Sequence, residues 1–336
     1  MAENDYAVVV GISRYPALRD LSGPVNDALS FRDWLLNRGA VPEENIELIV
    51  TPAYTETMTR KNAQPLRDQV INALDAILER NNNGGKAGRR FYLFLAGHGY
   101  APQVNDAALL MANAGGRSFP AVPGTQFANW FRESAKFEEI VLIMDCCREE
   151  YGTIPPQPLP WPNEPSPDAA LVRYFHAYAT QPFLYAREKI LPPDGMVRGI
   201  FTYALLTALE KALPDSAGRI TGTAVKDYVL NFMKKVIDTQ YQEPEIPIDS
   251  AKDIVLWQTD TIPTQTVEIH FGPSCRGDAR IVDSNLDTVW SGPIPEGRIL
   301  QREFVAGKYR IDTTDSSCGT RFDVMGALGE VIHVQL

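Results

Sequence analysis

Short, uninterrupted apolar runs alternate with amphipathic stretches over the first half of the chain. The apolar runs are Asp5 to Ile12, Asn45 to Val50, Phe91 to Ala96 and Ile140 to Met144. Their length and β-branched content are typical of strands buried on both faces. The stretches with helical spacing are Ala28 to Arg38, Asn62 to Arg80 and Phe127 to Ser134. This alternation predicts an α/β fold with right-handed crossovers and a mostly parallel central sheet.

The pattern changes after Met144. From Tyr151 to Asp168 the chain is so rich in proline that it excludes a helix and allows pairing only at a sheet edge, which predicts a loop. Further on, the expected elements are a strand at Leu171 to Thr180, helices at Gly199 to Ala212 and Thr223 to Thr239, and a strand at Asp253 to Trp257 that closes the sheet.

Beyond a linker near Thr259 to Gln265 the apolar period becomes two. The strands expected there are Thr266 to Phe271, Ala279 to Val282, Leu300 to Val305, Lys308 to Ile311 and Val331 to Leu336. Glycine, proline, aspartate and serine separate them, as in a small β-sandwich. We therefore expect two domains, residues 1–260, with a proline-rich loop at 148–170, and residues 261–336.

Composition narrows the classes of partner. The chain has 336 residues, 44% of them hydrophobic, with 42 acidic against 32 basic residues and a formal net charge of -10. An acidic surface argues against nucleic acid or an anionic membrane as the main partner. The N-terminal residues do not read as a signal peptide, and no apolar run approaches the roughly 18 residues that span a bilayer. The expected location is cytoplasmic.

The four cysteines are too few for a disulfide scaffold. Cys146 and Cys147 are adjacent and could join only in a strained ring, so we expect free thiols. For Cys275 and Cys318 we also expect free, buried thiols, as in a reducing cytosol. The alternative for this second pair is a disulfide, if the compartment is oxidising.

His98 and Cys147 each follow directly on a buried strand. The carboxyl ends of parallel strands share one edge of a sheet, where ligand crevices form, so we expect the two side chains to lie close together. A histidine can assist ionisation of a thiol, and the thiolate then attacks a carbonyl to form an acyl-enzyme. Backbone amides of Gly99 and Cys147 are the candidate oxyanion donors.

Several short motifs match one known superfamily. They are Tyr6 to Gly11, Gly23 with Asn26-Asp27-Ala28, Gly97-His98-Gly99, Asp145-Cys146-Cys147-Arg148, Tyr178-Ala179-Thr180 and Gly199-Ile200-Phe201-Thr202. With a histidine about 50 residues before the cysteine, they resemble the caspase and metacaspase superfamily. The resemblance implies a caspase-like three-layer sandwich and a cysteine endopeptidase with His98 and Cys147 as catalytic dyad, in which Cys146 takes the place of a small Ser or Ala. It also implies a regulated role in stress, cell death or anti-phage response.

Charge suggests the specificity of such a peptidase. Asp145 stands two residues before the nucleophile, as in metacaspases, where caspases carry Gln, and Leu21 stands where caspases carry a pocket arginine. Asp27, Asp145 and Glu188 are therefore the candidates for a pocket that takes Arg or Lys, because a buried cation needs carboxylates. The alternative is structural: Asp27 caps a helix and Asp145 bonds to backbone.

The segment from Glu149 to Val172 contains no Lys or Arg, although caspases are cut into two subunits there. A peptidase that requires basic residues could not cut itself in this segment. We therefore expect a single-chain active enzyme, with any self-cleavage near Arg187, Lys189 or Arg198.

Other features suggest alternatives. His176, His270 and His333 lie in apparent strands, where structural roles are the default. No metal or cofactor is expected: some metacaspases require calcium, but the chain has no calcium-loop pattern.

Where metacaspases carry His-Ser-Gly after the nucleophile, this chain has Arg148-Glu149-Glu150. This departure leaves open a catalytically weak interaction or signalling module as the alternative function. A plain α/β fold with structural Cys and His ranks last. Under the main hypothesis the partners are a protein or peptide substrate, and a further ligand of the C-terminal β domain.

Overall fold

The computed structural model describes residues 2–80, 85–149, 154, 157–192, 194–215, 217–236, 242–249, 252–259, 264–305, 307–315, 317–324 and 331–336. These residues divide into two compact units, one of residues 1–206 with 229–254 and one of residues 207–228 with 255–336. Parts of the predicted proline-rich loop and of the predicted linker, and Glu150, lie outside the described residues. Every helix in the described ranges is too short or too polar to cross a lipid bilayer.

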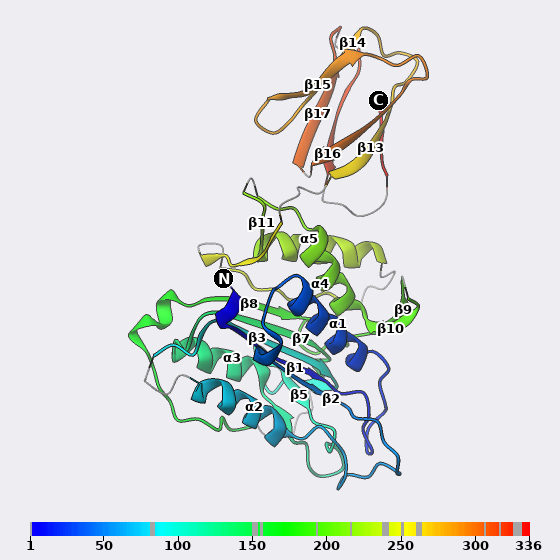
Figure 1. Cartoon of the computed structure of the whole chain (residues 1–336). Helices are drawn as coiled ribbons and strands as arrows, with labels where there is room; N and C mark the ends of the chain where they lie inside the picture. Colours follow the sequence, from blue (N-terminus) through cyan, green and yellow to red (C-terminus); the bar gives the residue numbers. More distant parts are fainter. Residues whose placement is uncertain are drawn as a thin grey trace. The chain divides into compact units, whose positions relative to one another are not determined.

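A five-stranded sheet with the order β2-β1-β3-β7-β8 forms the centre of the first unit (Figure 1). Its strands are β1 (Asp5–Gly11), β2 (Ile46–Val50), β3 (Gly88–Gly97), β7 (Phe137–Cys146) and β8 (Arg173–Tyr178). All four pairings are parallel, so the predicted α/β class with a parallel sheet is confirmed. In the β3–β7 register Gly97 lies opposite Cys146, which brings the residues that follow both strands to one edge.

Helices cover both faces of this sheet and make three layers (Figure 1). One face is covered by α1 (Pro24–Asn37), where Phe31 stacks on Phe94 with ring centroids 4.8 Å apart. The other face is covered by α2 (Arg67–Glu79) and α3 (Gly124–Glu133). Side chains along a strand point alternately to the two faces, so continuous apolar strands fit this double cover.

The edge of the central sheet differs from the expectation. The strand predicted at Asp253 to Trp257 is β12 (Val255–Gln258), which pairs with β11 (Arg219–Thr221) in a separate two-stranded sheet. The prediction that it closes the main sheet is therefore wrong. The antiparallel pairing with β11 provides hydrogen-bond partners for the backbone of this short strand. The main sheet therefore ends at β8.

Several short elements surround the strand ends. The first are β4 (Gly99–Tyr100), β5 (Ala108–Leu110) and β6 (Ala121–Val122), which form a small antiparallel sheet, and the hairpin of β9 (Glu188–Leu191) and β10 (Met196–Gly199). Short 3-10 helices lie at Ala2–Asn4, Glu43–Asn45 and Pro167–Leu171, and the described part of the chain has two further α-helices, α4 (Ile200–Lys211) and α5 (Gly222–Val236). Strands this short have too few positions to show an alternating pattern, so the sequence does not predict the β9–β10 hairpin.

The C-terminal strands form two sheets around one apolar core. The three-stranded sheet has the order β16-β13-β19, and the four-stranded sheet has the order β15-β14-β17-β18. Their bounds are β13 (Thr264–His270), β14 (Asp278–Val282), β15 (Thr288–Pro293), β16 (Ile299–Val305), β17 (Gly307–Thr313), β18 (Gly319–Val324) and β19 (Ile332–Gln335). Core residues come from both sheets, which confirms the sandwich-like class. Strands β15 and β18 were not predicted; β15 buries none of its side chains fully, so it lacks the apolar alternation.

A disulfide joins Cys275 and Cys318, whose Cα atoms are 5.3 Å apart. The expectation of free thiols at these positions is wrong. It rested on compartment alone, whereas the fold places the loop before β14 beside the start of β18. Cys146 and Cys147 are free, as expected.

Candidate active site

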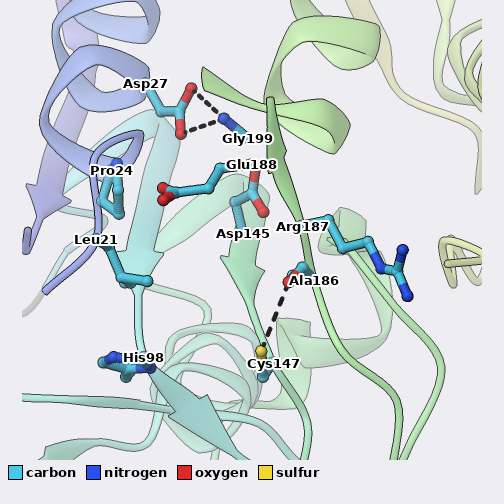
Figure 2. Close-up of a pocket in the computed structure, with 11 residues that line it drawn as sticks. Leu21, Pro24, Asp27, His98, Asp145, Cys147, Ala186, Arg187, Glu188 and Gly199 are labelled. Atoms are coloured by element: carbon cyan, nitrogen blue, oxygen red, sulfur yellow. Dashed lines mark hydrogen bonds between the residues drawn. The ribbon is translucent and has the colours of Figure 1, made fainter. Parts of the chain in front are cut away.

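One pocket lies at the carboxyl edge of the central sheet (Figure 2). It is lined by Leu21, Pro24, Asp27, Gly97, His98, Asp145, Cys147, Ala186, Arg187, Glu188 and Gly199. The structure therefore brings together all five side chains that the sequence predicts for the site. They come from the turn after β3, the end of β7, helix α1 and strand β9.

The turn after β3 needs glycine at two positions. Gly97 has a φ of +151°, and a Cβ there would lie 2.5 Å from the Tyr15 hydroxyl oxygen. A Cβ on Gly99 would lie 2.5 Å from the Cys146 Sγ and 2.7 Å from the Cys147 carbonyl oxygen. Real contacts of a Cβ are longer, so only glycine lets the histidine turn pack against the end of β7.

Backbone groups fix the orientation of His98. Its amide donates to the Tyr15 hydroxyl at 3.0 Å, and the Tyr15 ring meets the imidazole edge-on at 4.8 Å. The Nε2 atom lies 2.7 Å from the carbonyl oxygen of Arg19. A carbonyl only accepts, so Nε2 carries the proton and Nδ1 keeps its lone pair for use as a base. The sequence did not predict this role of Tyr15 and Arg19, since no local pattern ties that loop to His98.

The Cys147 thiol lies in the same pocket, with Sγ 3.8 Å from the Ala186 carbonyl oxygen. Burial raises the pKa of this thiol to about 11, and the nearby charges of Glu149 and Asp145 add to the effect. Within the described part of the chain no hydrogen bond joins the His98 ring to Sγ. The resting thiol is therefore neutral, and a reaction that uses the thiolate would need a base to take the thiol proton.

Cys146 has a different environment. Its side chain is 3% exposed, and burial is the main reason why the pKa of the thiol is raised; nearby charges contribute less. Its sulfur lies against Gly99 inside the core. This placement fits the predicted role of a small wall residue and leaves Cys147 as the cysteine that reaches the pocket.

The three predicted carboxylates hold backbone amides around the pocket. Asp27 accepts two hydrogen bonds from the Gly199 amide, at 2.9 and 3.1 Å. Asp145 accepts through Oδ2 from the amide and the hydroxyl of Thr202, at 3.0 and 2.6 Å. Both carboxylates thus lie at the N-terminus of α4, where the helix dipole favours negative charge. Glu188 accepts from the amides of residues 22 and 23, at 2.9 and 2.7 Å.

The alternative role predicted for Asp27 is that of a helix cap, and the structure changes which helix it binds. The N-cap of its own helix α1 is Gly23, without a side-chain hydrogen bond, so Asp27 does not cap α1. It binds the start of α4 from across the pocket. In Asp145 only Oδ2 is used: within the described residues, Oδ1 accepts no hydrogen bond. Structural and ligand-binding roles are compatible, because a carboxylate has about four lone-pair positions.

The carboxylates also repel one another. Burial raises the pKa of Asp145 to about 6, against the hydrogen bonds from Thr202, and the charge of Glu188 raises it further. Burial likewise raises the pKa of Asp27 well above its usual range, and the charge of Asp145 adds to the shift. Arg187 lines the pocket, but its side chain extends away from the carboxylates (Figure 2). Arg198, which pairs with Asp194, offsets part of the shift of Asp27. A cation entering the pocket would relieve the remaining repulsion among the carboxylates.

Arg148 has a structural role that the sequence did not predict. Its side chain is 1% exposed, pairs with Glu245 and donates to the carbonyl oxygens of Val104 at 2.8 Å and Thr180 at 3.4 Å. The guanidinium also lies over the Tyr178 ring, 4.6 Å from its centroid. Arg148, which follows Cys147, thus anchors the end of β7 and the neighbouring loops.

Replacing Arg148 by Met is expected to lower the free energy of unfolding by about 2–4 kcal/mol, because the groups that Arg148 binds lose their buried cationic partner. The expected decrease is smaller than that for an ion pair with both side chains fully buried, since the Glu245 side chain is 38% exposed. Urea unfolding followed by tryptophan fluorescence measures the change. Arg310→Met is the matched control, because Arg310 pairs with Asp312 at the surface. Equal losses in the two variants would contradict the anchor.

Three comparisons relate the chain to known proteins. The sequence model of the caspase domain matches residues 4–253. A probable protease of a Desulfuromonadales bacterium is 31% identical over 220 residues, which are 61% of this chain and 26% of the relative, so the chain spans about a quarter of that protein. The solved structure of pro-sf-caspase-1 has a TM-score of 0.42 and 12% identity, and covers 73% of this chain and 91% of that one.

Proposed function

Since this chain belongs to the caspase family of cysteine peptidases, we propose that it is an endopeptidase that cleaves protein substrates after Arg or Lys. The observation that carries the proposal is the convergence of three carboxylates on the pocket that also contains His98 and Cys147. A site with a nucleophile and a base but a neutral pocket would leave specificity open. Here the charge selects the residue.

The proposed reaction uses the dyad in two steps. The Cys147 sulfur attacks the scissile carbonyl carbon as His98 Nδ1 takes the thiol proton, and the amides of Gly99 and Cys147 donate to the oxyanion. The C–N bond breaks, and the leaving amine takes the proton from His98. Water then attacks the thioester carbonyl carbon and gives one proton to His98. The C–S bond breaks, the acid leaves, and the Cys147 sulfur takes the proton back from His98.

The pocket binds the side chain on the acyl side of the cleaved bond. A guanidinium or ammonium group placed beside Asp145 Oδ1 meets an oxygen that is not occupied by backbone. An Asp side chain at the same place would be desolvated against Asp27, Asp145 and Glu188, which is expensive for an unpaired charge. Electrostatics therefore favour Arg and Lys over Asp.

Substrate charge also acts on the nucleophile. The Asp145 carboxylate is one of the charges that raise the pKa of the Cys147 thiol. A bound cation neutralises that carboxylate and so removes part of the penalty for forming the thiolate. Basic substrates thus gain in kcat as well as in KM, because the interaction helps the chemical step.

A fluorogenic peptide panel tests the function. Peptides identical except for Arg, Lys, citrulline or Asp at the cleaved position are assayed with and without calcium, and Arg and Lys are expected to be cleaved at least roughly 100-fold faster than citrulline or Asp. Preferred cleavage after Asp would contradict the pocket assignment. Hydrolysis of none of the peptides would favour the interaction module, for which the high thiol pKa is the supporting observation.

The pH profile of cleavage is expected to show the pocket carboxylate. Asp145 has a pKa raised to about 6, so it is neutral below that pH and binds a cation only above it. For the Arg peptide, kcat/KM is therefore expected to rise about tenfold per pH unit below pH 6 and to level off above it, beyond any change that the dyad itself causes. The citrulline peptide is the control, since it shares the dyad but carries no charge. Identical profiles for both peptides would rule out the assignment.

A further inference from the structure

The outer face of the C-terminal three-stranded sheet carries two histidines and a glutamate. Glu268 and His270 are two residues apart on β13, so their side chains point to the same face. His333 lies on β19, directly opposite Glu268 in the parallel register. The alternate residues Ile269 and Val334 point into the sandwich core. Strand geometry thus gathers three potential ligands on the face that looks away from the core.

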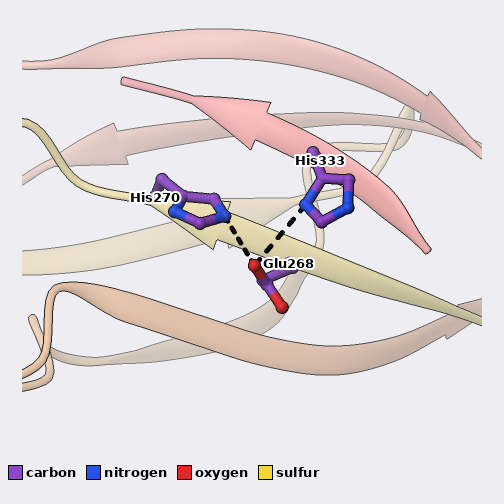
Figure 3. A group of neighbouring side chains, drawn as sticks. All are labelled: Glu268, His270 and His333. Atoms are coloured by element: carbon purple, nitrogen blue, oxygen red, sulfur yellow. Dashed lines mark ion pairs between the residues drawn. The ribbon is translucent and has the colours of Figure 1, made fainter.

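The three side chains point toward one another (Figure 3). Oε1 of Glu268 lies 2.6 Å from Nε2 of His270 and 3.5 Å from Nδ1 of His333. All three atoms lie within 4.8 Å of one another, and no other group of three His, Cys, Asp or Glu residues meets this criterion in the described ranges. A tetrahedral ion with ligand bonds of about 2.0–2.2 Å holds its ligand atoms roughly 3.3 Å apart, so shifts of about 1 Å suffice.

We propose that Glu268, His270 and His333 form a site for a divalent transition metal of the zinc type. Two imidazole nitrogens and one carboxylate oxygen are a donor set that zinc takes, whereas calcium and magnesium prefer oxygen alone. The side chains of Glu268, His270 and His333 are 25%, 29% and 59% exposed, which leaves room for water as a fourth ligand. This proposal departs from the expectation that His270 and His333 have only structural roles.

The metal would join β13 to the last strand of the sandwich. Residues 325–330, which precede β19, lie outside the described ranges. A metal that binds one side chain on β19 and two on β13 would stabilise the folded sandwich by mass action, because the unfolded chain does not hold these ligands together. This proposal is independent of the peptidase function.

Cobalt binding to the full chain tests the site. Co²⁺ is added without thiols or chelators to the Cys147→Ala protein, in which the nucleophile cannot compete for metal. One equivalent is expected to bind, with the visible absorption of a tetrahedral Co²⁺ site, and Zn²⁺ is expected to displace it. His333→Gln and Glu268→Gln are each expected to weaken binding roughly 10- to 100-fold.

His98→Ala in the same Cys147→Ala background is the matched control, because it removes a histidine outside the cluster and should leave the affinity unchanged. Zn²⁺ should also raise the thermal unfolding temperature of the chain with the intact cluster more than that of His333→Gln. No saturable binding, or binding that survives both His333→Gln and Glu268→Gln, would overturn the proposal and leave the cluster as a pair of His–Glu contacts.

Discussion

Replacing Cys147 by Ala is expected to lower kcat/KM for the Arg peptide by at least about 10³-fold, because it removes the nucleophile. Cys146→Ala is the matched control, since it removes a thiol of the same size from the adjacent position. Cys146→Ala is expected to lower kcat/KM by no more than roughly threefold, because it removes only a buried sulfur that packs against Gly99. The Cys147 sulfur lines the pocket, whereas the Cys146 side chain is 3% exposed.

Initial rates with the fluorogenic peptide measure both variants, and thermal unfolding shows whether each is folded. If Cys146→Ala were the inactive variant, or if Cys147→Ala kept most of its activity, the assignment of the nucleophile would fail. The intact masses of the same preparations test the expected single chain. Any self-cleavage should be near Arg187, Lys189 or Arg198, and should disappear in Cys147→Ala.

Asp145→Asn is expected to lower kcat/KM for the Arg peptide by roughly 100-fold while changing cleavage of the citrulline peptide little. The asparagine oxygen can still accept the hydrogen bonds from Thr202, so the substitution removes charge more than structure. The free energy of unfolding should not fall greatly, because the loss of one buried carboxylate also relieves repulsion with Asp27 and Glu188. Assays of both peptides, with urea unfolding in parallel, separate the two effects.

Glu188→Gln provides the comparison within the pocket. Glu188 is exposed and accepts from two amides of the loop before α1, so its charge should contribute less, roughly a tenfold loss for the Arg peptide. If the carboxylates were purely structural, Asp145→Asn would destabilise the fold and slow both peptides equally. A preference for Arg that survives both substitutions would place the specificity elsewhere.

The local pattern was sufficient for the central sheet and for the placement of His98 and Cys147 at one edge of it. Continuous apolar runs mark strands buried on both faces, and the parallel arrangement then brings the residues after β3 and β7 to one edge. His98 and Cys147 were found for this reason. The change of the apolar period to two predicts the C-terminal β sandwich. It does not predict β15, because none of the side chains of this strand is fully buried. The sequence does not predict the Cys275–Cys318 disulfide either, since the number of cysteines does not say which of them lie close together in the fold.

By itself the sequence determined the fold class and the positions of the candidate site residues His98 and Cys147, because both depend on short-range periodicity and on where apolar runs end. Only the tertiary structure decided what surrounds those side chains. It places Asp27 and Asp145 at the start of α4, buries Arg148 against Glu245 and sets His333 opposite Glu268. These contacts join segments far apart in the chain. They follow from how the layers pack, which no local pattern encodes.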